Sequence, residues 1–153
     1  GQDTPLTLPT LSRLNLLQRG FTIAFWVKPD ASASSNLTIL KSLNNQFALS
    51  LQPTGANYRA QVVMNGTLLS LTSSRNITGG AWNHVVVKYN DGSQVVSVYV
   101  NGAVVAQTSS VAPLGVDDTL LAGGSPQGRN YLLDDLRIFN RPLTILDINR
   151  LDK

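Results

Sequence analysis

The acidic side chains are the residues whose type and spacing could do chemistry in this chain. All nine are Asp, and four of them form two adjacent pairs, Asp117-Asp118 and Asp134-Asp135. Glycoside hydrolysis requires two carboxyl groups about 5–10 Å apart, one of which donates a proton. The run LLDDLRIFNRPL (132–143) predicts a strand, and neighbouring strand residues point to opposite faces. Asp134 and Asp135 therefore cannot flank one bond, and Asp117-Asp118 lies in a predicted loop without an evident partner, so we expect no enzyme.

Asp134 raises a separate question, because alternation places it in a row with Leu136 and Ile138. An unpaired buried carboxylate is costly. Three interpretations follow: Asp134 accepts backbone N–H groups from a loop, or it binds Ca²⁺, which takes about six to eight oxygen ligands, or the strand register shifts and leaves it exposed. Asp135 has a simpler environment, because Arg137 follows two residues later on the same face and can pair with it.

The remaining chemistry-bearing residue types are scarce. His84 is the one histidine, so a Ser-His-Asp site would have to use it. Its place at the head of WNHVVV favours a packed, hydrogen-bonded strand residue instead. The chain has no cysteine, which excludes disulfides and thiolate metal sites. The net charge of +3 comes from singly scattered Lys and Arg, and no apolar run approaches a membrane span, so we expect neither nucleic-acid binding nor membrane insertion.

The elements that must position these residues are strands. Three turn sequences lie between apolar runs, namely Asn65-Gly66, Asn101-Gly102 and the triplet at 90–92. Asn-Gly and Asp-Gly tolerate the positive φ angles of type I′ hairpin turns. Further strands are predicted at 21–28, 37–42, 46–52, 58–63 and 119–122.

The end of the chain predicts one short helix. Thr144 is a plausible N-cap, Asp147 follows three residues later, and Ile145, Ile148 and Leu151 recur near helical spacing. We therefore expect an all-β body, a two-sheet antiparallel sandwich closed by one C-terminal helix, as a single domain over residues 1–153.

Three segments resemble the signature blocks of laminin G-like, concanavalin A-like jelly-roll domains: FTIAFWVKPD (21–30), WNHVVVKYNDGSQVVSVYVNGAVVA (82–106) and LLDDLRIFNRPLTILDI (132–148). Their order and spacing also match. The resemblance covers nearly the whole chain and is weakest in the first twenty residues and around 107–130. It implies a jelly-roll sandwich and a non-catalytic module, and it places Trp26 and Trp82 in the core.

The resemblance also bears on metal binding. Many domains of this type carry Ca²⁺ at the edge of the sandwich, and Asp134 matches a recurrent acidic position of the motif. Asp3 is a second candidate ligand, because the terminal strands of the fold often lie near each other. The resemblance therefore implies one structural Ca²⁺. Hydrolases of this fold place paired Glu residues on a strand, and this chain has no Glu.

Glycan recognition favours exposed aromatic faces beside amide and carboxylate hydrogen-bonding groups. Two predicted loop–strand junctions have that composition, and their residues are the candidate ligand-binding set: Asn57, Tyr58, Arg129, Asn130 and Tyr131. Exposed loop residues on a rigid scaffold suit binding, although ordinary strand-edge packing uses the same residue types.

These observations predict a binding module of a secreted or cell-surface protein, cut from a longer chain, whose partner is a glycan or a surface protein. The alternative is a structural spacer or protein-interaction domain, and a hydrolase is the outsider. Glycosylation sequons begin at Asn36, Asn65 and Asn76, and the one in the tight turn at Asn65 is interpreted as incidental.

Overall fold

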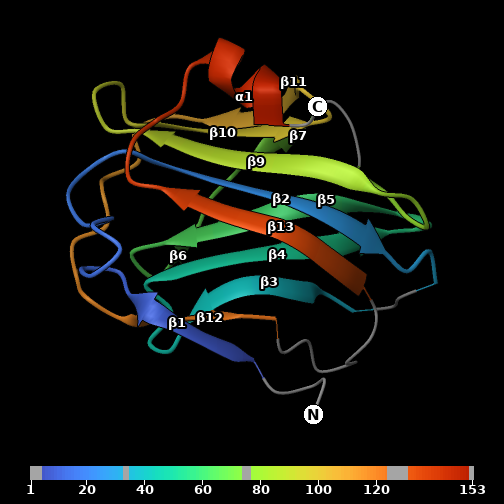
Figure 1. Cartoon of the computed structure of the whole chain (residues 1–153), viewed down its shortest axis with the longest axis horizontal. Helices are drawn as coiled ribbons and strands as arrows, with labels where there is room; N and C mark the ends of the chain where they lie inside the picture. The colour runs from blue at the N-terminus through green and yellow to red at the C-terminus, as the bar shows by residue number, and fades with distance from the viewer. Residues whose placement is uncertain (1–4, 33–34, 74–76, 124–130, 152–153) are drawn as a thin grey trace.

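The computed structural model describes residues 5–32, 35–73, 77–123 and 131–151. Two antiparallel β-sheets pack face to face, and one short helix lies against the outer surface of one of them (Figure 1). The predicted all-β sandwich with a single short C-terminal helix is confirmed.

The chain passes back and forth between the two sheets. The seven-stranded sheet runs β1 (Leu6–Thr10), β12 (Thr119–Ala122), β3 (Leu37–Ser42), β4 (Phe47–Thr54), β5 (Asn57–Met64) and β6 (Thr67–Leu68), with β8 (Ile77–Thr78) also paired to β5. The six-stranded sheet runs β13 (Tyr131–Phe139), β2 (Phe21–Pro29), β9 (Asn83–Asn90), β10 (Val95–Val100), β11 (Ala103–Thr108) and β7 (Thr72–Ser73).

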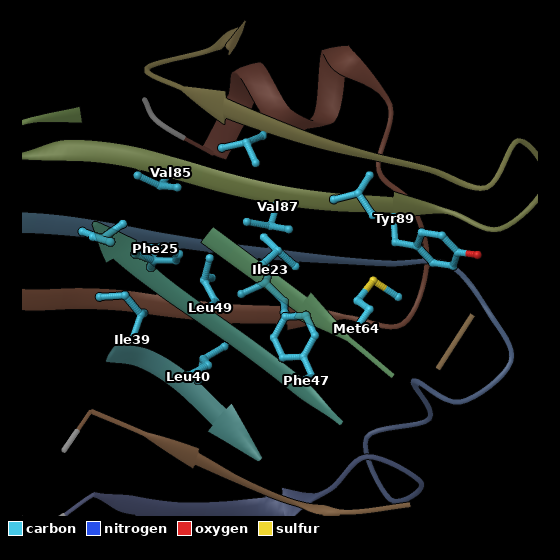
Figure 2. Close-up of a cluster of buried hydrophobic side chains, with 14 of the residues drawn as sticks. Ile23, Phe25, Ile39, Leu40, Phe47, Leu49, Met64, Val85, Val87 and Tyr89 are labelled. Carbon is cyan, nitrogen blue, oxygen red and sulfur yellow. The ribbon is translucent and has the colours of Figure 1, made fainter. Parts of the chain in front are cut away.

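The core fills the space between the sheets, as Figure 2 shows. Alternation in β2 sends Phe21 and Phe25 inward, where both are fully buried. The Phe21 ring meets Phe47 of the opposite sheet edge-on at 5.7 Å and lies 5.7 Å from the Tyr89 ring. Each large apolar side chain buried this way contributes about 1.5–3 kcal/mol to the stability of the fold. Burial of one face of each strand in this core leaves the opposite face pointing outward.

Both predicted Asn-Gly turns have the positive φ angles that a type I′ turn needs. Asn65 and Gly66 have φ angles of 54° and 78°, and Asn101 and Gly102 have 52° and 87°. Positive φ at both central positions is the signature of a type I′ hairpin, so these two predictions are confirmed.

The turn between β9 and β10 differs from its prediction. Its positive φ falls on Gln94, at 57°, rather than on Gly92. The Asn90 side chain accepts hydrogen bonds from the backbone N–H groups of Gly92 and Ser93, at 3.0 and 3.2 Å. This side-chain capping makes a longer loop than a two-residue turn.

Helix α1 (Ile145–Leu151) begins where its cap predicts. The backbone N–H of Asp147 donates to the Thr144 hydroxyl at 3.2 Å. Ile148 is fully buried and packs with other apolar residues of the outward face of the six-stranded sheet, among them Ala24 and Tyr99. The helix therefore covers part of that face and leaves the end near residues 26–28 uncovered by it (Figure 1).

Candidate functional site

A β-bulge in β13 decides the position of Asp134. Asp134 is paired with Trp26 and Arg137 with Ala24, so β13 carries one residue more than β2 between these pairs. Asp135 is the irregular position, with a φ of 53°. The bulge shifts the alternation by one residue, so that Leu133 before it and Leu136 after it both pack on the core, while Asp134 is exposed. The expectation that Asp134 lies in a buried apolar row is wrong, and the shifted-register interpretation describes it.

The carboxylates at the bulge form local contacts. Asp134 accepts a hydrogen bond from the backbone N–H of Asp135 at 2.9 Å. Asp135 accepts one from Arg137 Nε at 3.0 Å, with both side chains close to half exposed. This pair follows the prediction for these two residues.

These carboxylates do not by themselves make a calcium site. Within residues 5–32, 35–73, 77–123 and 131–151, no three His, Asp or Glu side chains group together as metal ligands. Asp3 lies outside the described residues. The calcium assignment of Asp134 and Asp3 stays a prediction.

The role of a backbone lock, which was one interpretation of Asp134, belongs instead to Asp118. Its side chain is 6% exposed and accepts hydrogen bonds from Asn44 N at 2.8 Å, Asn44 Nδ2 at 3.0 Å and Thr119 N at 2.9 Å. Burial by itself would raise the pKa of Asp118, but hydrogen bonds from Ser42, Asn44 and Thr119 outweigh it and lower the pKa. Asp118 therefore joins the β3–β4 turn to the start of β12.

Asp117 ties the neighbouring loop. Its two carboxylate oxygens accept hydrogen bonds from the Ser12 backbone N–H at 2.9 Å and from the Ser12 hydroxyl at 2.6 Å. These bonds lower the pKa of Asp117. The second Asp pair is thus used in folding, at the end of the sandwich where the segment after β1 meets β12.

Two ring side chains pack together on the outward face of the six-stranded sheet. Trp26 pairs with His84 across β2 and β9, and the ring centroids are 5.0 Å apart. His84 is 3% exposed, as expected of a packed strand residue, and Trp26 is half-buried. Trp82, just before β9, is 44% exposed, so its assignment to the core is wrong. Alternation identifies the face of a strand residue but not whether another layer covers that face.

A pocket opens near this ring pair, at the end of the sandwich where β2 ends and β13 begins. It has a volume of about 540 Å³. We call it the rim pocket, and its lining residues are Lys28, Pro29, Asp30, Ala31, Gly80, Tyr131 and Leu132. Leu132 is 56% exposed, and its neighbour in the register is Lys28.

Three of the predicted ligand-binding residues lie at this end of the molecule, namely Asn57, Tyr58 and Tyr131. Tyr131 lines the rim pocket, and its hydroxyl donates to the Thr38 carbonyl oxygen. Burial raises the pKa of Tyr131 to about 12, so the hydroxyl stays protonated at neutral pH. Arg129 and Asn130 lie outside the described residues.

Tyr58 and Asn57 form hydrogen bonds with main-chain groups next to the rim pocket. The expectation of an exposed Tyr58 ring is wrong, because the residue is 1% exposed and belongs to the core. Its hydroxyl donates to the Asp30 carbonyl oxygen, and Asn57 Oδ1 accepts from the Gly79 backbone N–H at 3.3 Å. Both contacts hold main-chain segments that border the rim pocket. The strand pattern placed these residues correctly at a junction but could not show which side chain points inward.

Two glycines give this end its shape. A Cβ on Gly79 would lie 1.9 Å from the Ala56 carbonyl oxygen, so no side chain fits there. Gly80 has a φ of 77°, and its N–H donates to the Pro29 carbonyl oxygen at 2.7 Å. The β8–β9 turn can therefore lie close to the end of β2 and form one wall of the pocket.

The three sequons have different environments. Asn36 is exposed, and its Nδ2 donates to Gln61 Oε1 at 3.1 Å. Asn65 uses its side chain inside the fold, donating from Nδ2 to the carbonyl oxygens of Ala112 and Pro113 at 3.2 and 3.0 Å. Asn76 lies outside the described residues.

The chain belongs to the concanavalin A-like lectin/glucanases superfamily, whose sequence profile matches residues 1–149. This result confirms the resemblance carried by the three sequence blocks. A comparison with curated proteins gave no significant match. Among the described residues, no helix has the length and hydropathy needed to cross a membrane.

Solved structures with this fold include three of different origin. Domain 4 of AbnA, an extracellular GH43 arabinanase from Geobacillus stearothermophilus solved with arabinotriose, has a TM-score of 0.72 and 19% identity over 97% of this chain and 72% of its own. A heptameric SAP-like pentraxin from Limulus polyphemus has a TM-score of 0.70 and 18% identity over 96% and 72%. The binding domain of botulinum neurotoxin DC, solved with SialylT, has a TM-score of 0.65 and 18% identity over 88% and 35%. At these identities the likeness shows the fold.

Proposed function

We propose that this chain is a non-catalytic carbohydrate-binding module of a secreted or cell-surface protein, and that the glycan binds in the rim pocket. The observation that carries the proposal is the pocket itself, which combines apolar surface from Leu132 and Tyr131 with the charged groups of Lys28 and Asp30. Its volume of about 540 Å³ lies within the range of about 300–1,000 Å³ that small-molecule sites occupy.

The lining residues match the two kinds of surface that a sugar presents. The C–H face of a pyranose or furanose ring packs on apolar and aromatic surface, here Leu132 and Tyr131. Its hydroxyl groups pair with the ammonium group of Lys28 and the carboxylate of Asp30. Hydrogen bonds from the Ser32 backbone and hydroxyl lower the pKa of Asp30, which keeps it ionised as an acceptor at neutral pH.

The absence of catalysis is part of the proposal. Asp30 is the one carboxylate among the described residues that line the rim pocket, whereas glycoside hydrolysis generally uses two. Two of the similar structures were solved in complex with a ligand, domain 4 of AbnA with arabinotriose and the binding domain of botulinum neurotoxin DC with SialylT, which supports a binding role. One structural Ca²⁺ held by Asp134 and Asp3 is kept as part of the proposal.

The test is a glycan array followed by isothermal titration with the best saccharide. Leu132→Ser removes apolar pocket surface, and Leu146→Ser is the matched control, because Leu146 is 70% exposed on α1 and does not line the pocket. We expect Leu132→Ser to weaken binding about tenfold, equivalent to about 1.4 kcal/mol, and Leu146→Ser to leave it unchanged. Equal affinities for all three proteins would contradict the rim pocket as the site.

A second candidate function, a protein-contact or spacer domain, is favoured by the exposed apolar residues of α1. Ile145 and Leu146 are 58% and 70% exposed on the outer side of the helix. The same two variants separate the candidates. A contact function would be lost with Leu146→Ser in a self-association or pull-down measurement, while Leu132→Ser would retain it.

A further inference from the structure

The outward face of the seven-stranded sheet has an unusual charge distribution. None of the seven strands contains an Asp or Glu, while β3 and β5 contribute Lys41 and Arg59. Both cations are exposed. Neither cation forms an ion pair with another described residue. The ion pairs among the described residues are Arg137–Asp135 and Arg141–Asp147, and neither lies on this sheet. The face therefore carries uncompensated positive charge.

Between these cations the face presents aligned hydrogen-bonding groups. Thr38, Ser50 and Gln61 are neighbours in the register across β3, β4 and β5, and Gln52 lies opposite Arg59. The amides are linked in one direction: Asn36 Nδ2 donates to Gln61 Oε1 at 3.1 Å, and Gln61 Nε2 donates to Gln52 Oε1 at 2.9 Å. We call Asn36, Gln61 and Gln52 the amide ladder.

The ladder ends in a small hollow. Its volume is about 120 Å³, and Gln52, Arg59 and Gln61 line one part of it. The amide ladder uses the oxygen of Gln52, and Gln52 and its cross-strand neighbour Arg59 line the same hollow. Arg presents a planar fork of donors that matches the two oxygens of a carboxylate or sulfate group. The remaining lining comes from Ala60, Leu68, Leu69 and Leu71.

We propose that the outward face of the seven-stranded sheet binds an anionic polysaccharide, with an acidic group at Arg59 and the chain running along the sheet toward Lys41. The spacing favours an extended ligand. Lys41 and Arg59 are two strands apart laterally and four residues apart along the strand direction, about 17 Å between Cα atoms from a strand spacing of about 4.8 Å and a rise of about 3.4 Å. An extended polymer that runs along the sheet is long enough to contact both cations.

Charge and side-chain type argue against a nucleic acid on this face. Single strands bind on aromatic platforms, and duplex binding requires many phosphate contacts. No aromatic ring stands at the outward positions of β4 and β5, which hold Ala48, Ser50, Gln52, Thr54, Asn57, Arg59, Gln61 and Val63. Hydroxyl and amide groups flanked by two cations suit the hydroxyls and separated acidic groups of a polysaccharide.

The experiment measures binding of the whole chain to polygalacturonate, dextran sulfate and neutral dextran as salt is raised. We expect binding to one or both anionic polymers, weakening with salt, and none to dextran; the two polymers separate carboxylate from sulfate recognition. Arg59→Gln should weaken the binding about tenfold. Lys88→Gln is the matched control, because it removes the same charge from the outward face of the other sheet.

Three outcomes would overturn this proposal: no binding to either anionic polymer, an equal loss with Arg59→Gln and Lys88→Gln, or equally tight binding of duplex DNA. The rim pocket is tested separately. Leu132→Ser should leave binding of the anionic polymer intact, so failure at one surface does not count as failure at the other. A second substitution, Arg59→Lys, distinguishes charge from geometry, because it keeps the charge and loses the planar fork, and we expect intermediate affinity.

Discussion

Replacement of Asp118 by Asn tests whether a buried carboxylate, rather than core packing alone, joins the β3–β4 turn to β12. The two side chains have the same shape, so the substitution removes charge and one acceptor without leaving a cavity. In the native chain Oδ2 accepts the Asn44 N–H, and Oδ1 accepts Asn44 Nδ2 and the Thr119 N–H. The Asn variant sets an amide N–H₂ against one of these donors.

The expected magnitude follows from those three contacts. A hydrogen bond to a charged group contributes about 1.5–3 kcal/mol, and a buried donor left unsatisfied costs about 1–3 kcal/mol. Asn keeps one of the two oxygens, so we expect a loss of about 2 kcal/mol in the free energy of unfolding. For a domain of this size that corresponds to a fall in Tm of about 4–8 °C.

The effect should depend on pH in one direction. The hydrogen bonds lower the pKa of Asp118 in the folded state below its unfolded value of about 3.9. Its contribution is therefore complete above the unfolded pKa and is lost as pH falls through the folded pKa. The stability difference between the wild type and Asp118→Asn should be largest at neutral pH and should shrink in acid.

Urea unfolding at neutral and acid pH is the assay, with Asp91→Asn as the control. Asp91 is exposed in the β9–β10 turn, so this variant makes the same change of charge without removing a buried acceptor. A loss of less than about 0.5 kcal/mol for Asp118→Asn, the usual range for neutral surface changes, would refute the lock. A difference from wild type that is constant from neutral to acid pH would also refute it.

Three other changes test the elements around the rim pocket. Asp135→Ala should lower the free energy of unfolding by about 1 kcal/mol, because Ala tolerates the positive φ poorly and the exposed pair with Arg137 is lost, while Asp135→Gly should stay within about 0.5 kcal/mol; equal unfolding curves for Ala and Gly would contradict the conformational argument. Gly79→Ala should cost about 2 kcal/mol or more, because its Cβ would overlap the Ala56 carbonyl, and thermal unfolding without a shift in Tm would show that the turn relaxes freely. The hydroxyl of Tyr131 should ionise only near pH 12 in an ultraviolet titration, and ionisation at the ordinary value near 10 would mean that its ring is not buried at the pocket wall.

The fold was predictable because its strongest signals are local. Asn65-Gly66 and Asn101-Gly102 favour the positive φ angles of a tight hairpin, and both turns form as predicted. Thr144 likewise caps the helix that its sequence predicts. Such features depend on a few adjacent residues, so one sequence is enough to identify them.

The bulge at Asp135 could not be predicted, and its effect extended to the site. A single residue with positive φ shifts every later side chain of β13 to the other face, and the residue type alone does not reveal at which position of a strand such a shift occurs. Regular alternation predicted that Asp134 faces the core, where a calcium or backbone-lock role would follow, whereas the carboxylate that locks a loop is Asp118.

The rim pocket was only partly predictable. The sequence identified the Tyr131 junction. It predicted an exposed Tyr58 and a buried Trp82, whereas Tyr58 is buried and Trp82 is 44% exposed. Burial at these positions depends on which segments lie over the end of each strand. That information is tertiary, and no periodicity in the sequence carries it.

The most direct test of the proposed function is to map a bound saccharide by NMR. Backbone amide shifts of the chain would be followed during titration with the best neutral saccharide from the glycan array. Binding at the rim pocket predicts the largest shift changes at Lys28, Asp30, Gly80 and Leu132, with none at Gln61 or Arg59 on the other sheet. Saturable changes confined to any other region, or no changes with any saccharide, would contradict the assignment of this pocket as a glycan site.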